Sequence, residues 1–248
     1  MNLQAKSFIF IVIAGILALG ANAGLGQGEK ATAQRTSLDG IQRIKPTSVE
    51  IMPDITMEEY NRMSQLADQG KIDEDSFYSI PVFSSLYFQG CSWYCGGWVD
   101  TITDSGHLAP QGDFTYDAQN AHDFDHESVW ATNGNGVGQY LTFTFAGNCP
   151  RITSVAILNG HVKTDQAWRN NSRVKSLLLY YNDKPYRLLE LEDSRSLQHF
   201  DVDTLGYGPN AENAPKWTLK FEILEVYPGK KYNDCVIADF IFDGIDVH

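Results

Sequence analysis

Two carboxylates, Asp123 and Asp125, lie two residues apart in the segment 120–130. This spacing presents hard oxygen ligands on one turn, which suits Ca²⁺. Trp130 follows as an anchor to a core, and Asp239 is a third carboxylate that a neighbouring strand could bring to the same ion. The alternative is a turn without metal, in which the aspartates accept hydrogen bonds from backbone N–H groups. The pattern therefore predicts either one structural calcium ion or an Asx-type turn.

Two histidines, His122 and His126, flank these aspartates. Imidazole and carboxylate groups together can hold Zn²⁺ for hydrolysis, provided that both rings turn inward and one coordination position stays open. The remaining histidines form no partner motif, and the chain has no Gly-x-Ser-x-Gly nucleophile elbow. A small metal-dependent hydrolase is thus an alternative hypothesis, whereas the main expectation is a protein that is not an enzyme.

A possible ligand-binding group lies between two expected strands, at Trp168, Asn171 and Arg173. An aromatic ring, an amide and a planar guanidinium suit the ring faces and hydroxyl groups of sugars. The alternative is structural: Arg173 pairs with an acidic neighbour such as Asp193, and Trp168 covers the sheet edge. Both interpretations stay open at this point.

The four cysteines are Cys91, Cys95, Cys149 and Cys235. An even number in an exported chain suggests two disulfides, and four cysteines allow three pairings. We favour Cys91 with Cys95 and Cys149 with Cys235. A zinc site is the weaker alternative, because no second close pair of cysteines follows the first.

The first residues have the features of an export signal. Lys6 begins a short positive region, residues 8–19 are almost wholly apolar, and Ala21 and Ala23 are small residues before an expected cleavage at Gly24. The apolar run is too short to span a membrane. We expect a signal peptide over 1–23 and an exported protein that is periplasmic, secreted or on the cell surface, without membrane insertion after cleavage.

The acidic composition excludes some partners. Loss of Lys6 with the signal peptide changes the formal net charge from −12 to about −13. Such a chain repels phosphate backbones and anionic lipid surfaces, so nucleic acid and membranes are poor partners.

Two regions are expected after the signal peptide. Residues 24–84 are predicted to be a flexible leader, with a capping box at Thr56 and Glu59 that opens a short helix over 56–69. Residues 85–248 show strict alternation of apolar and polar residues, with Gly, Asn, Asp and Pro between the runs, which predicts an all-β antiparallel sandwich. The expected strands are 140–145, 152–158, 174–181, 186–191, 198–202, 217–223 and 236–242.

The order of several short blocks resembles a known family. The blocks are Asn120-Ala121-His122-Asp123 with Trp130, Gly136-Val137-Gly138-Gln139-Tyr140, Ile157-Leu158-Asn159-Gly160, Asn171-Ser172-Arg173-Val174-Lys175, Glu192-Asp193-Ser194, and Tyr227-Pro228-Gly229-Lys230 with Ile237-Ala238-Asp239. Together they resemble the glycan-binding translocation domain of streptococcal NAD glycohydrolase toxins, within the galactose-binding-like, discoidin-type jelly rolls. The resemblance covers roughly residues 88–245.

This resemblance implies a carbohydrate-binding or cell-surface attachment module, and it favours the calcium interpretation of the Asp123 turn. One departure counts against the ion: Cys235 and Asp239 stand where related domains tend to carry a small residue and a longer Glu. The NAD-cleaving domain is not implied, so no NAD is expected as a cofactor. A second hypothesis is an adhesion scaffold that binds a protein partner through its N-terminal region.

Overall fold

The computed structural model describes residues 38–52, 57–73 and 92–247. The expected signal peptide 1–23, the first part of the leader, Thr56 and Cys91 lie outside the described residues. The chain divides into two units, residues 1–38 and 39–248, and every described helix and strand lies in the second unit. Within the described part of the chain, no helix is long and apolar enough to cross a membrane.

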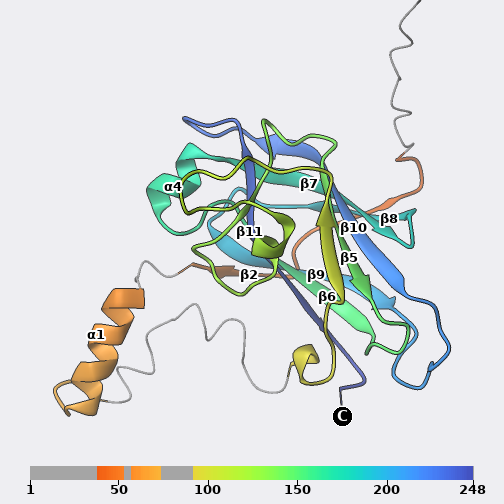
Figure 1. Cartoon of the computed structure of the whole chain (residues 1–248), viewed down its shortest axis with the longest axis horizontal. Coiled ribbons are helices and arrows are strands. Elements are labelled where there is room, and N and C mark those ends of the chain that lie inside the picture. Colours follow the sequence, from red (N-terminus) through yellow and green to blue (C-terminus); the bar gives the residue numbers. More distant parts are fainter. Residues whose placement is uncertain (1–37, 53–56, 74–91, 248) are drawn as a thin grey trace, which may run out of the picture. The chain divides into compact units, whose positions relative to one another are not determined.

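The strands form an all-β sandwich of two leaves, as the sequence predicts (Figure 1). The first leaf has the order β2-β9-β6-β11, with β4 paired to β11, and the second has the order β1-β8-β7-β10-β5-β3. Their bounds are β1 Gln42–Ile44, β2 Ser48–Ile51, β3 Thr101–Asp104, β4 Trp130–Ala131, β5 Tyr140–Phe145, β6 Ile152–Asn159, β7 Ser172–Tyr181, β8 Lys184–Glu190, β9 Ser196–Leu205, β10 Trp217–Tyr227 and β11 Cys235–Gly244. All seven expected strands are confirmed, most of them with slightly longer bounds.

The two leaves meet at one corner of the sandwich. There β11 runs beside β7 in parallel for two residue pairs, Cys235 with Ser172 and Val236 with Arg173. Beyond this corner β11 pairs with β6 in an antiparallel ladder, and β7 pairs with β8 and β10. The start of β7 is therefore the place where a side chain can contact loops of both leaves.

Aromatic side chains fill the space between the leaves. On β5, Leu141, Phe143 and Phe145 are buried while the residues between them are partly exposed, so the period of two places one face of the strand in the core. The ring of Phe240 on β11 lies 5.2 Å from that of Phe143 and 4.6 Å from that of Phe221, centroid to centroid. These contacts between strands of opposite leaves show that the sandwich is closed by packing.

The outer face of the first leaf is buried as well. A second apolar cluster there includes Leu158, Leu197, Ile241 and Trp168. Because both faces of β11 are covered, its sequence is an almost continuous apolar run that does not alternate.

The region that was expected to be a flexible leader contributes two strands. β1 pairs in parallel with β8 at the edge of the second leaf, and β2 pairs with β9 at the edge of the first. The expectation of a wholly flexible leader is therefore wrong for residues 42–51. These strands are only three and four residues long, too short for their periodicity to stand out in the sequence.

The helices are few. Helix α1, Met57–Asp68, confirms the expected helix over 56–69. Helix α4, Asp165–Asn170, connects β6 to β7 (Figure 1). Two short 3₁₀ helices, Trp93–Cys95 and Ala118–Ala121, precede β3 and β4.

Candidate functional site

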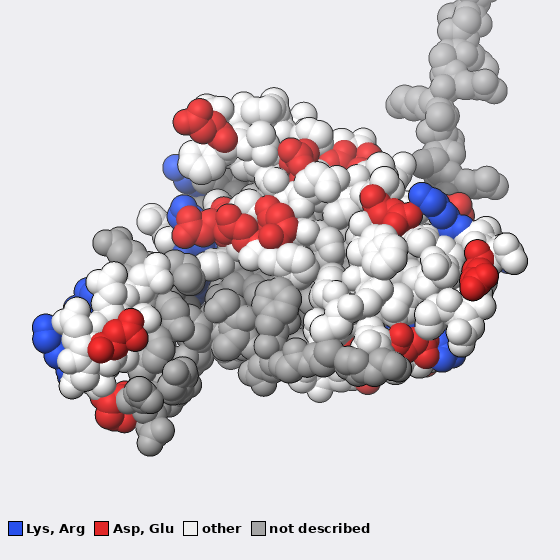
Figure 2. Space-filling model, turned by 60° about the horizontal axis from the view of Figure 1, so that its bottom comes forward, with Lys and Arg blue, Asp and Glu red and all other residues white. Residues whose placement is uncertain are grey.

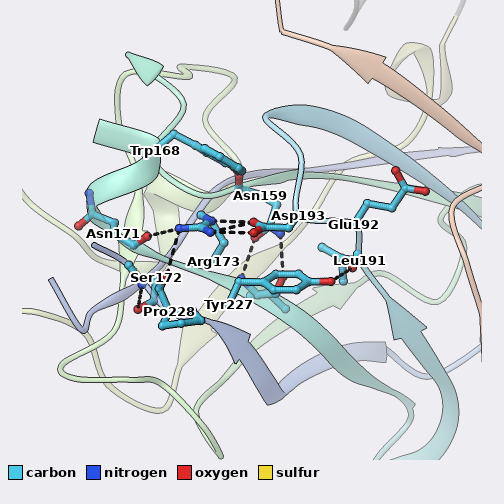
Figure 3. A network of polar contacts seen from close by, with 12 residues as sticks. Asn159, Trp168, Asn171, Ser172, Arg173, Leu191, Glu192, Asp193, Tyr227 and Pro228 are labelled. Carbon is cyan, nitrogen blue, oxygen red and sulfur yellow. Dashed lines mark hydrogen bonds and ion pairs between the residues drawn. The ribbon is translucent and has the colours of Figure 1, made fainter. Parts of the chain in front are cut away.

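Arg173 joins three loops at the corner where the leaves meet. Its Nε and Nη2 donate to Oδ1 and Oδ2 of Asp193 at 2.9 and 3.0 Å, and its Nη1 donates to the carbonyl oxygen of Asn171 at 2.9 Å. The residue is only 6% exposed. Figure 3 shows the guanidinium directed at Asp193 with the ring of Trp168 beside it. A planar fork of this kind fixes both partners, so Arg173 ties β7 to the connection between β8 and β9.

Trp168 is held just as firmly. It lies in α4, whose first turn is capped by Thr164, since the Oγ1 of that residue accepts a hydrogen bond from Ala167 N at 3.0 Å. The indole Nε1 of Trp168 donates to Asn159 O at 3.0 Å, and the Arg173 guanidinium carbon lies 4.4 Å from the ring centroid. With 7% of its surface exposed, the ring is not a stacking platform for a ligand.

The structural alternative for this group is therefore the one that the geometry supports. Arg173 pairs with Asp193, and Trp168 packs against the sheet, so both side chains hold loops in place. Asn171 is directed elsewhere, because it lines a different hollow from the other two. The structure thus brings Trp168 and Arg173 together, and Asn171, whose carbonyl oxygen accepts from Arg173, lines the other hollow.

Two hollows lie on either side of this region. The first, which we call the basic hollow, has a volume of about 440 Å³. It is lined by Asp165, Trp168, Arg169, Arg173, Asp193, Ser194, Arg195, Pro228 and Lys230. The second, which we call the tyrosine hollow, has a volume of about 250 Å³. It is lined by Leu108, Gln111, Tyr116, Val129, Ala131, His161, Asn171, Tyr232, Asp234 and Val236.

The tyrosine hollow combines an apolar floor with polar groups. Its floor comprises buried aliphatic side chains, among them Val129 and Val236, and Tyr232 at its rim is 44% exposed. Within the described residues, Nε2 of His161 is buried without a hydrogen-bond partner. Burial is the main cause that lowers the pKa of His161, and the charge of Lys163 adds to it. A neutral imidazole can both donate and accept hydrogen bonds, which suits a hydroxyl group.

Backbone hydrogen bonds hold the two hollows in a fixed relationship. The end of α4 and the loop after β10 form a ridge between them, in which Lys230 N donates to Arg169 O at 2.9 Å and Tyr232 N donates to Asn170 O at 2.8 Å. Lys230 belongs to the basic hollow and Tyr232 to the tyrosine hollow. A ligand that crosses this ridge would contact both hollows.

The aspartates of the Asp123 turn accept hydrogen bonds from the turn itself, as in an Asx-type turn. Oδ1 of Asp123 accepts from Asp125 N at 2.9 Å and its Oδ2 accepts from Ser128 Oγ, while Oδ1 of Asp125 accepts from Glu127 N at 2.9 Å. Asp239 is fully buried on β11. Among the described residues, no three acidic, histidine or cysteine side chains are grouped so that they could hold a metal ion. The described residues therefore do not group Asp123, Asp125 and Asp239 as one set of ligands, and calcium binding stays a prediction from the sequence.

His122 belongs to the core. Its Nδ1 lies 2.6 Å from the carbonyl oxygen of Phe240, and its ring packs against Phe124 and Phe242 at 5.1 and 5.5 Å. Burial is the main cause that lowers its pKa. The zinc interpretation of His122 with His126 is not supported, since no three histidine, cysteine or acidic side chains of the described residues are grouped as a metal site requires.

The structure corrects one of the two cysteine pairings. Cys149 and Cys235 are both buried and are not bonded to each other. The Sγ of Cys149 instead lies 3.6 Å from Trp98 O. The predicted disulfide between Cys149 and Cys235 is wrong, because β11 places Cys235 at the corner with β7, where it pairs with Ser172. The pairing of Cys91 with Cys95 involves a residue outside the described part.

The sequence interpretation missed most of the tyrosine hollow. The sequence pattern assigned no binding role to Tyr116, His161, Tyr232 or Asp234. The sequence offered one signal for this hollow, the aromatic residue Tyr232 in an otherwise polar turn. A ring in such a turn is not expected to pack in the core, so it is a candidate for contact with a ligand. The contacts that bring residues 108–116, 161, 171 and 232–236 together come from tertiary structure alone.

The fold and its loops define a galactose-binding-like jelly roll. The chain belongs to the NAD glycohydrolase translocation F5/8 type C domain family, whose model matches residues 93–243. This agrees with the resemblance carried by the short sequence blocks. A comparison with curated proteins finds no match.

Several solved structures are similar at low sequence identity. One contains the CBM32-1, CBM32-2 and M60 catalytic domains of Clostridium perfringens ZmpB, with 13% identity, a TM-score of 0.44, and coverage of 77% of this chain and 21% of that chain. A second is CBM32-3 from a family 31 glycoside hydrolase of the same organism, with 15% identity, a TM-score of 0.39, and coverage of 58% and 91%. A third is a GH29 fucosidase of Ruminococcus gnavus in complex with fucose, with 14% identity, a TM-score of 0.38, and coverage of 73% and 33%. The chain thus spans about a fifth of the first of these proteins and a third of the last.

Proposed function

We propose that this protein is an exported, non-catalytic module that binds a glycan in the tyrosine hollow. The observation that carries the proposal is the exposed ring of Tyr232 beside the polar groups of His161, Asn171 and Asp234, over an apolar floor. A sugar has an apolar ring face and a rim of hydroxyl groups. An aromatic ring suits the first, and imidazole, amide and carboxylate groups suit the second.

The rigidity of the surrounding backbone supports the same function. Tyr232 is fixed by its backbone bond to Asn170, and the side chain of Asn171 donates to Ala167 O at 2.8 Å. Asp234 accepts a hydrogen bond from Gly134 N at 3.1 Å through Oδ1. Groups that are held before the ligand arrives lose little conformational entropy on binding, which favours affinity.

Family membership supports a role in binding or translocation, because the matching model describes a translocation domain. The proposal of export rests on the expected signal peptide over 1–23. NAD cleavage is not part of the proposal, and a structural calcium ion at the Asp123 turn stays a prediction from the sequence.

The test is a glycan array, followed by calorimetry with the glycans that bind. Shallow sugar sites are individually weak, so the array should display the protein in multivalent form. Tyr232→Ala should reduce the affinity about tenfold, because it removes most of the apolar contact at the rim. Tyr207→Ala is the matched control, since Tyr207 is also 44% exposed but does not line the hollow.

Two results would contradict the proposal. One is the absence of binding to any glycan, with and without calcium. The other is an equal effect of the Tyr232 and Tyr207 variants, which would show that the hollow is not the site.

A further inference from the structure

The basic hollow differs in charge from the rest of the molecule. Its lining carries four cationic side chains and two carboxylates, which leaves two formal positive charges. The whole chain has a formal net charge of −12, and Figure 2 shows acidic side chains spread over one face of it. A local excess of positive charge on an acidic protein attracts anions to that place and away from the rest of the surface.

The two carboxylates of the hollow are each engaged by an arginine. Asp193 is bound by Arg173 through both oxygens, and Asp165 pairs with Arg169 at 2.7 Å. Arg195 and Lys230 are the other two cationic side chains of the lining. The Nε of Arg195 donates to Val162 O at 2.9 Å, which fixes that side chain at the hollow.

The carboxyl group of Asp165 responds to these charges. Its pKa is lowered mainly by the hydrogen bond from Arg169, and the charges of Arg195 and Lys230 contribute in the same direction. The positive charges of Arg169, Arg195 and Lys230 therefore all act at the carboxyl group of Asp165, which shows that they lie close to one another.

We propose that the basic hollow is a second subsite, which takes the anionic group of an acidic glycan whose neutral part occupies the tyrosine hollow. This inference rests on the proposed function. The anionic group is a carboxylate or a sulfate, since both present several acceptor oxygens to ammonium and guanidinium donors. The hydroxyl group of Ser194, in the same lining, is a further donor for such an oxygen.

The ridge between the hollows is short enough in sequence for one loop to serve both of them. The backbone bonds from Lys230 N to Arg169 O and from Tyr232 N to Asn170 O hold two residues of one loop against the last residues of α4. Lys230 serves one hollow and Tyr232, two residues later, serves the other. A ligand that occupies both hollows therefore crosses the loop at 230–232.

The experiment compares three probes that share one neutral part: lactose, 3′-sialyllactose and 3′-sulfolactose. Calorimetry at low salt should give a higher affinity for at least one acidic probe than for lactose, and the difference should shrink as salt is added. Lys230→Glu should reduce the affinity for the preferred acidic probe about tenfold and leave that for lactose unchanged. Sialyllactose and sulfolactose distinguish a carboxylate from a sulfate as the preferred group.

A charge-matched control is available in Lys184→Glu. Lys184 is an exposed residue at the far end of the β7–β8 hairpin from Arg173, so its replacement changes the net charge equally without altering the hollow. It should leave all three affinities unchanged.

The outcomes separate the two proposals. Equal affinity for lactose and both acidic probes would overturn the anionic subsite and leave the proposed function standing. An equal effect of Lys230→Glu and Lys184→Glu would also overturn the subsite. It would show that the preference for acidic probes depends on the net charge of the protein and not on the basic hollow. Binding of none of these probes, nor of any glycan on the array, would overturn both.

Discussion

The guanidinium of Arg173 and the carboxylate of Asp193 form a two-point ion pair, with N–O distances of 2.9 and 3.0 Å. The pair connects the first residues of β7, where the two leaves meet, to the connection between β8 and β9. Arg173 is nearly buried, whereas the side chain of Asp193 is 39% exposed at the wall of the basic hollow. The pair therefore stabilises the loops that carry the candidate site.

Replacing Arg173 should destabilise the protein clearly. Arg173→Ala leaves Asp193 and the carbonyl oxygens of Asn171 and Pro228 without their donor. We expect a loss of about 2–4 kcal/mol in the free energy of unfolding. Arg173→Lys should recover little of it, because an ammonium cannot form the planar fork. Chemical denaturation measures both. Lys175→Ala is the control, since the exposed pair of Lys175 with Glu225 should contribute less than about 1 kcal/mol. Equal losses in the Arg173 and Lys175 variants would contradict the structural role of Arg173.

Gly160 should resist substitution because of its neighbours and its backbone conformation. Its φ is +92°, and an added Cβ would lie 2.7 Å from both Cγ of Arg173 and Cδ1 of Trp168. Gly160→Ala should therefore cost roughly 2–4 kcal/mol, the sum of backbone strain and displaced packing. Gly138→Ala has a similar φ of +86° with nothing within 4 Å of the new atom, so it should cost about 1 kcal/mol. Thermal unfolding measures the loss of stability in both variants. A loss in Gly160→Ala no larger than that in Gly138→Ala would contradict the close contact of Gly160 with Trp168 and Arg173.

Stability should fall at mildly acidic pH because of His122. Its pKa is lowered in the folded state, mainly by burial, from an ordinary value of 6.5. Below that pH the unfolded chain binds the proton more readily than the folded one, so the stability present at higher pH is lost as the pH falls below about 6.5. The burial that lowers the pKa of His126 and His161 acts in the same direction.

The size of this effect can be assigned to His122 by mutation. One such group changes the free energy of unfolding by about 1.4 kcal/mol per pH unit in the affected range. His122→Gln should remove the part of this pH dependence that comes from His122. The free energy of unfolding, measured by denaturation, should therefore change less between pH 7 and pH 5 in the variant than in the wild type. An identical pH dependence in both proteins would show that His122 is not buried in neutral form.

The thiols of Cys149 and Cys235 should be unreactive in the native protein. Burial raises the pKa of Cys235 to about 12 and also raises that of Cys149, and only a thiolate reacts readily with alkylating reagents. Both should be labelled only after denaturation. Peptide mapping without reduction checks the correction directly, because a fragment that links Cys149 to Cys235 would contradict the structure.

The sandwich was predictable from sequence wherever its strands alternate or run apolar for six residues or more. β5 and β10 have one buried face each, and this gives the period of two that the residues display. β1, β2 and β4 were not predictable, since two to four residues are too few to show a period, and their pairing depends on partners far along the chain.

The candidate site was predictable only in part. Asn171 was selected for its chemistry and lines the tyrosine hollow, whereas Trp168 and Arg173 were selected for the same reason and hold the fold together. Residue type alone does not separate these roles. An arginine that forms a structural ion pair and an arginine that binds a ligand look the same in the sequence. The distinction comes from exposure and from the position of Asp193.

The most direct test of the account is to map a bound glycan on the protein. Backbone amide shifts recorded by nuclear magnetic resonance during titration with a glycan from the array report where the ligand lies. The account predicts the largest shifts at His161, Asn171, Tyr232 and Asp234. Shifts that cluster on another face, or a protein whose spectrum no glycan changes, would contradict it.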